Sequence, residues 1–143
     1  MKKVLLLILL LGLTSCKVFN PQSNKAQTAL VYAKPVAYLA TKSVFDLAVS
    51  QEDKIKKAEI VRKIATSIRS LSSGEVPTPE QLHLTIANVA PDKTHWNDFA
   101  IALTQTYQGY YEQIVTGDIK AKYIADILNK IASGCEEAVE QIL

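Results

Sequence analysis

The side chains that most often carry catalysis or bind metal ions are few in this 143-residue chain, and their spacing does not group them. His83 and His95 are the only histidines, and neither has a neighbouring cysteine or histidine at metal-ligand spacing. A structural zinc site normally has four such ligands, so we predict no metal site. The chain has no Gly-Xaa-Ser-Xaa-Gly motif, and Glu136, Glu137 and Glu140 fit a solvated helix face. These patterns predict a protein that is not an enzyme.

Tyrosines form the one group that suggests a binding surface. Tyr107, Tyr110 and Tyr111 lie within about one and a half turns of a predicted helix, with Tyr107 and Tyr111 on one side. Because tyrosine combines a large apolar ring with a polar hydroxyl, we expect this cluster to be a candidate contact for a protein partner. Packing in the core, with the hydroxyls reaching solvent, is the alternative. Gly109 would allow a partner or a neighbouring helix to approach closely.

The N-terminal segment ends at Cys16, which with Cys135 makes up the cysteine content of the chain. Two lysines precede an uninterrupted apolar run over residues 4–11, and Leu13-Thr14-Ser15-Cys16 follows it. The apolar stretch is about half of the roughly 20 residues that a membrane span needs. The segment resembles the signal peptide and lipobox of bacterial lipoproteins, and the resemblance covers residues 1–16. An ordinary secretory signal, which would leave Cys16 as a free thiol, is the alternative.

The lipoprotein resemblance implies that residues 1–15 are removed and that Cys16 becomes the first mature residue, with lipid attached to its sulfur. Two or three acyl chains would anchor the protein stably, because each buried methylene contributes about 0.8 kcal/mol. No other cofactor is expected. Lys17 stands where enteric lipoproteins of the inner membrane typically have aspartate, which favours the periplasmic face of the outer membrane in a Gram-negative host. Residues 16–24 then form a tether, and residues 25–143 form the domain.

Charge is distributed unevenly along the predicted mature chain. Loss of the first two lysines lowers the basic count from 16 to 14, which equals the 14 acidic residues, so the formal net charge falls from +2 to zero. Ten basic and four acidic residues lie in 17–73, whereas four basic and ten acidic residues lie in 74–143. The basic half could contact an anionic membrane, or basic and acidic helices could balance one another within a bundle. No basic run with interleaved aromatic residues is present, so we expect no nucleic-acid partner.

Apolar residues recur at spacings of three and four throughout the rest of the chain, which predicts helices. The first expected helix is 25–49, with a kink or break near Lys34 caused by Pro35, and the second runs from the N-cap Ser50 to a turn at 72–74. A short third helix runs from the Thr78 capping box to about Val89. The fourth covers 93–115 and is capped by Asp92 or Thr94, and the fifth runs from the cap Asp118 to Leu143, continuous through Gly134. Cys135 falls on the apolar stripe of the last helix, where we expect it to be buried without a disulfide.

The fold class predicted is all-α: one domain that forms an irregular bundle of about five helices, one of them short. Our first hypothesis is a non-enzymatic lipoprotein that binds another envelope protein. In size and class only, the chain is similar to secretion-system pilots and to exclusion or immunity factors. A small-molecule or lipid carrier with an apolar cavity lined by Ala33, Ala37 and Ala40 is the alternative. A passive membrane-surface protein is the third possibility.

Overall fold

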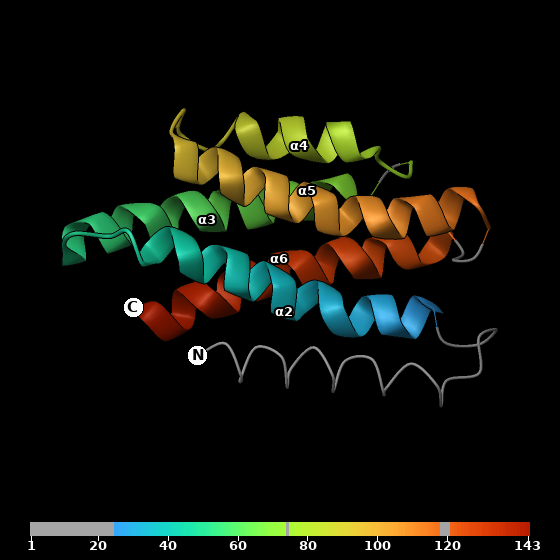
Figure 1. Cartoon of the computed structure of the whole chain (residues 1–143), viewed down its shortest axis with the longest axis horizontal. Helices are drawn as coiled ribbons and strands as arrows, with labels where there is room; N and C mark the ends of the chain where they lie inside the picture. The colour runs from blue at the N-terminus through green and yellow to red at the C-terminus, as the bar shows by residue number, and fades with distance from the viewer. Residues whose placement is uncertain (1–24, 74, 118–120) are drawn as a thin grey trace, which may run out of the picture.

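The computed structural model describes residues 25–73, 75–117 and 121–143, and this part of the chain is built from helices. Its elements are α2 (Lys25–Phe45), α3 (Gln51–Leu71), α4 (Pro79–Ala87), α5 (Thr94–Val115), the 3₁₀ turn η2 (Ala121–Tyr123) and α6 (Ile124–Ile142) (Figure 1). The all-α prediction is confirmed, with one short helix, α4. The predicted signal peptide, the lipidation site Cys16 and the tether lie outside the described residues.

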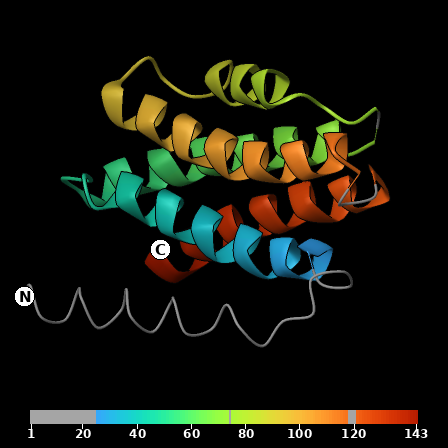
Figure 2. The ribbon, with the colours of Figure 1, turned by 45° about the vertical axis from the view of Figure 1, so that its right-hand side comes forward.

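Helix α6 is the central packing element of the bundle. It lies against α2 and α3, which contact each other far less, and α5 packs on α2 and α4. Figures 1 and 2 show α4 on one side of the bundle and α2 on the opposite side, with α5 and α6 between them. The fold therefore presents two outer helices, α2 and α4, that face away from each other.

Two predicted N-caps are present in the structure. The Asp53 backbone N–H donates to the Ser50 hydroxyl oxygen at 3.1 Å, at the start of α3. At α4 the Gln81 N–H donates to the Thr78 hydroxyl at 3.2 Å, and the Thr78 N–H donates back to the Gln81 side chain at 2.7 Å. This reciprocal capping box satisfies two backbone donors that the first turn leaves unpaired. Both helices therefore begin where the sequence predicts.

Helix α5 begins differently, because its N-cap is Lys93 and no side chain makes the capping hydrogen bond. The prediction that Asp92 or Thr94 serves as the cap is wrong. The helix instead starts after a turn in which the Lys93 N–H donates to the Pro91 carbonyl at 2.8 Å. The proposed cap of the last helix, Asp118, lies outside the described residues; α6 itself starts at Ile124, after η2.

The sequence predicts a kink or a break near Lys34, and of the two the break is absent, because helix α2 is continuous through Pro35. It ends at Phe45, four residues before the predicted end at Val49. Phe45 is buried, and the Ala48 N–H donates to its carbonyl at 2.8 Å, which closes a turn in place of another helical turn. The chain has to reverse here, because α3 begins at Gln51.

Small residues allow α2 and α6 to cross closely. Ala33 and Ala37 are fully buried, and α6 passes through Gly134 without interruption. A Cβ atom at Gly134 would collide with the backbone carbonyl oxygen of Lys34 and lie 3.0 Å from the Ala37 Cβ. Only a glycine fits at this crossing, which explains why α6 contains one in its interior despite its low helix propensity.

Candidate partner-binding surfaces

The predicted tyrosine cluster is mainly part of the core. Tyr107 is fully buried, and its hydroxyl donates to the Pro77 carbonyl at 2.7 Å. Its ring lies 6.2 Å from that of Tyr111. Burial raises the pKa of Tyr107 far above its usual value and raises that of Tyr110 as well. Tyr107 therefore packs in the core, as the alternative predicts, but its hydroxyl is buried and does not reach solvent.

Tyr110 and Tyr111 lie at the two edges of the buried side of α5, and both are partly buried. They therefore do not form one continuous surface with Tyr107, although each remains partly accessible. Gly109 lies on the exposed side of α5, where a Cβ atom would meet nothing within 4 Å. No described helix approaches there, so the neighbouring-helix explanation for this glycine is not supported.

A shallow surface groove follows the connection between α3 and α4 and continues along α4. It encloses about 440 Å³ and is lined by Ser70, Leu71, Ser73, Glu75, Val76, Pro77, Gln81, Leu84, Thr85 and Asn88. Leu84 is 52% exposed, and polar side chains flank it. Tyr107 is not a lining residue, but its hydroxyl donates to the carbonyl of Pro77, which is one. The groove thus combines an exposed apolar side chain at Leu84, polar side chains around it, and a lining residue, Pro77, whose carbonyl is held by a hydrogen bond from the core.

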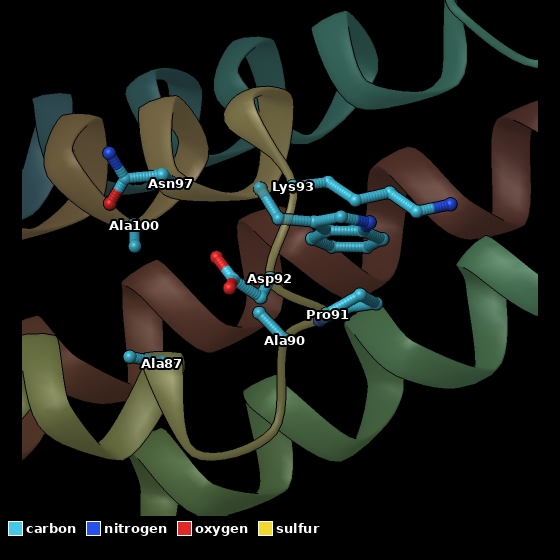
Figure 3. Close-up of a pocket in the computed structure, with 8 residues that line it drawn as sticks. Ala87, Ala90, Pro91, Asp92, Lys93, Asn97 and Ala100 are labelled. Atoms are coloured by element: carbon cyan, nitrogen blue, oxygen red, sulfur yellow. The ribbon is translucent and has the colours of Figure 1, made fainter.

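A smaller pocket of about 200 Å³ lies at the corner between α4 and α5 (Figure 3). Its lining includes Ala87, Ala90 and Pro91, together with the buried Trp96. Figure 3 shows the Lys93 side chain extending away from Asp92 and Asn97, so these polar groups do not converge on one point. Convergent polar groups are what orient a ligand in a small-molecule site.

The carrier hypothesis requires an apolar cavity between helices, and the residues predicted to line it have another role. Ala33 and Ala37 pack at the α2–α6 crossing, and Ala40 is partly buried against the core. The groove of about 310 Å³ between the same helices is lined by Lys34 and Glu137, which form an ion pair of 2.5 Å. A charged surface groove does not suit an apolar ligand.

Ion pairs connect the basic and acidic halves of the chain. Arg69 on α3 donates through both terminal nitrogens to the Glu136 carboxylate on α6, and Lys34 on α2 pairs with Glu137. The Arg69 guanidinium holds the pKa of Glu136 below its usual value. These contacts agree with the alternative in which basic and acidic helices balance one another within the bundle. Glu136 and Glu137 are thus paired and partly buried, and only Glu140 matches the solvated face predicted for all three.

The remaining groups with catalytic potential are isolated from one another. The His83 ring nitrogen Nδ1 lies 3.5 Å from the Thr104 hydroxyl, and the His95 ring lies 5.8 Å from that of Trp96. Cys135 is fully buried, as predicted, and burial raises the pKa of its thiol to about 11. Over residues 25–73, 75–117 and 121–143, no three His, Cys, Asp or Glu side chains come together in a way that would hold a metal ion.

One surface was not predicted from the sequence. The side of α2 that faces away from the bundle carries Val31, Tyr32, Pro35, Val36 and Leu39, and all five are exposed. We call these residues the outer α2 face. Their spacing is itself helical, so the sequence carries a signal for them as a second apolar stripe on the same helix.

None of the helices in the described part of the chain has both the length and the apolar character needed to cross a membrane. Comparison of the chain with protein-family models, with curated proteins and with solved structures finds no match. Its function is therefore inferred from its own residues and their arrangement.

Proposed function

We propose that this protein is a lipid-anchored lipoprotein of the cell envelope whose helical domain binds another protein and catalyses no reaction. The N-terminal segment supports the anchor, because its apolar run and the sequence Leu13-Thr14-Ser15-Cys16 resemble a lipoprotein signal and lipobox. In a Gram-negative host, Lys17 after the lipidated cysteine favours the periplasmic face of the outer membrane.

The observation that carries the binding part of the proposal is the α3–α4 groove with Leu84 exposed in it. Protein interfaces typically have an apolar anchor at the centre and a polar rim around it. Gln81, Thr85 and Asn88 provide such a rim next to Leu84. The groove backbone is held in place by the Tyr107–Pro77 hydrogen bond, so a partner would meet a preformed surface.

The three tyrosines take different parts in this proposal. Tyr107 is buried and acts on the groove only by positioning Pro77. Tyr110 and Tyr111 are proposed as contacts through the portions that remain accessible at the edges of α5. A partner that covers the groove and extends along α5 would meet these portions.

Metabolic labelling with palmitate in the native host tests the anchor. The wild-type protein and a Cys135→Ala variant should both incorporate label and sediment with membranes, whereas a Cys16→Ala variant should do neither. Cys135→Ala is the matched control, because it removes the other cysteine of the chain. Equal membrane retention of the Cys16→Ala variant would contradict the anchoring proposal.

Crosslinking in intact envelopes followed by purification tests the groove. Replacing Leu84 with aspartate should lower recovery of the crosslinked partner by about tenfold or more, as expected when a central interface anchor is lost. Ile55→Asp on α3 is the matched control, since Ile55 is 47% exposed compared with 52% for Leu84. Undiminished recovery with Leu84→Asp would remove the groove from the proposal.

A further inference from the structure

The outer α2 face is apolar, although it faces away from the bundle. A helix on the surface of a globular protein normally exposes charged and polar residues opposite its buried stripe. Helix α3, of the same 21-residue length, follows this rule with Lys56, Glu59 and Lys63 exposed. Over residues 31–39, the exposed residues of α2 are apolar apart from one tyrosine, and Lys34 is partly exposed toward α6.

The exposed apolar residues of α2 are large and contiguous. Val31, Tyr32 and Leu39 are 64%, 59% and 62% exposed, and Pro35 and Val36 lie between them on the same side. Ala33 and Ala37 on the other side of the helix are fully buried. Helix α2 therefore has two apolar sides, one used for packing on α6 and α5 and one without a partner among the described residues.

The charge of α2 favours an anionic partner. The helix contains Lys25, Lys34 and Lys42 and no acidic residue. Lys42 is exposed, while Lys34 neutralises Glu137 of the adjacent α6 at 2.5 Å. Lysines combined with exposed valine, leucine and tyrosine are the composition of helices that lie in the interfacial region of membranes with anionic lipids.

The position of α2 in the chain places this face near the proposed anchor. Lys25 follows Cys16 by nine positions, and the eight intervening residues span at most about 28 Å when fully extended. At a rise of 1.5 Å per residue, Leu39 lies about 21 Å along the helix from Lys25. The whole outer α2 face is thus within reach of the bilayer in which the acyl chains of Cys16 would be inserted.

We propose that the outer α2 face lies on the surface of a bilayer containing anionic phospholipids, with Tyr32, Val36 and Leu39 inserted among the headgroups. This inference rests on the proposed lipid anchor and specifies how the domain is oriented above it. Because α4 lies on the opposite side of the bundle from α2, the groove around Leu84 would face away from the membrane, toward a protein partner (Figures 1 and 2).

Depth-dependent fluorescence on the lipidated protein tests this orientation. The protein is purified from its host with lipid attached, reconstituted in vesicles of phosphatidylethanolamine and phosphatidylglycerol, and labelled with an environment-sensitive dye at Leu39→Cys. Leu84→Cys on α4 is the matched control, since its exposure of 52% is close to the 62% of Leu39. Cys135 is fully buried, so the dye reacts with the introduced thiol.

We expect spin-labelled lipids to quench the dye at Leu39 by about twofold or more and to leave the dye at Leu84 nearly unchanged. A second variant carries Tyr32→Glu with the dye at Leu39. Its quenching should fall to the level seen at Leu84 while the protein stays on the vesicles, because the lipid on Cys16 is unaffected. That result separates contact of the helix with lipid from anchoring.

Several results would overturn the inference, and they can be told apart. Lipidated protein whose Leu39 dye is quenched no more than the Leu84 dye contradicts the orientation alone. A photocrosslinker placed at Leu39 in cells that joins a protein, a second copy or residues 17–24 also contradicts it. Protein with an unmodified Cys16 in its host contradicts both this inference and the proposed function.

Discussion

Tyr107 shows how a single hydroxyl links the core to the surface. It is fully buried on α5, and it donates to the carbonyl of Pro77, which belongs to the lining of the groove. A tyrosine at this position therefore has two separable functions, packing through its ring and positioning through its hydroxyl.

Replacing Tyr107 with phenylalanine should destabilise the domain by about 1–2 kcal/mol, because the Pro77 carbonyl loses a buried hydrogen-bond donor. Replacement with alanine should cost about 3–5 kcal/mol, since the ring is lost as well. Urea unfolding followed by circular dichroism measures both values. A midpoint that does not change with Tyr107→Phe would show that the hydroxyl contributes nothing to stability.

The ion pair between Arg69 and Glu136 makes stability depend on pH. Because the pKa of Glu136 in the folded protein is lowered by Arg69, its contribution is fully present above the unfolded value of about 4.3 and is lost as the pH falls through the folded pKa. Glu136→Gln should therefore be less stable than wild type at pH 7, and the difference should shrink below about pH 4.

Chemical denaturation of wild type and Glu136→Gln across this pH range measures the effect. Glu140→Gln provides a control, since Glu140 is exposed on the same helix. A difference between wild type and Glu136→Gln that is constant with pH would contradict the assignment. Added salt should weaken the effect only in part, because both partners are partly buried.

At the scale of the helices, two glycines offer opposite predictions. Glycine in an exposed helix interior costs about 1 kcal/mol relative to alanine, so Gly109→Ala on α5 should stabilise the domain by about that amount. Gly134→Ala should instead destabilise it by about 1–3 kcal/mol or more, because the added Cβ collides with the Lys34 backbone. Thermal unfolding of the two variants measures both changes. Stabilisation by Gly134→Ala would show that α2 can move away at no cost.

The elements that were predictable from the sequence are those governed by local chemistry. Ser50 and the Thr78–Gln81 capping box fix the starts of α3 and α4, because a cap requires particular side chains at fixed positions. The end of α2 was predicted four residues too late, since apolar residues such as Leu47 continue the helical spacing beyond Phe45. That boundary is set by the reversal into α3, which is a tertiary constraint.

The candidate surfaces were less predictable, because they depend on which helix covers which residue. The spacing of Tyr107, Tyr110 and Tyr111 places them close together on one helix, but only the fold shows that Tyr107 faces the core and that the other two lie at its edges. The groove around Leu84 is lined by residues of both α3 and α4 and of the connection between them, so the sequence pattern of either helix alone does not predict it. The outer α2 face has a sequence signal of its own, but the inner apolar stripe of the same helix already accounts for a helix, so the pattern alone does not reveal which second face stays exposed.

For the molecule as a whole, the rate at which the Cys135 thiol is labelled reports how often the helical core unfolds. Its thiol is fully buried on α6, and its pKa is raised to about 11, so at pH 8 it is almost entirely protonated. A thiol reagent should react with it only when α6 separates from α2 and α3, which requires disruption of most of the core. Labelling should therefore track the free energy of global unfolding as urea is added. Fast labelling of the native protein without urea would reveal local opening at α6.

The central position of α6 also bears on when the domain can form. In the chain α6 follows α2, α3 and α5, yet α2 and α3 pack mainly on α6 and only sparsely on each other. A nascent chain that has been synthesised only as far as α5 lacks α6, which is the main packing surface of both α2 and α3. For the exported lipoprotein proposed above, an order of elements in which the core is completed only when α6 has been synthesised would delay folding and so favour translocation of an unfolded chain.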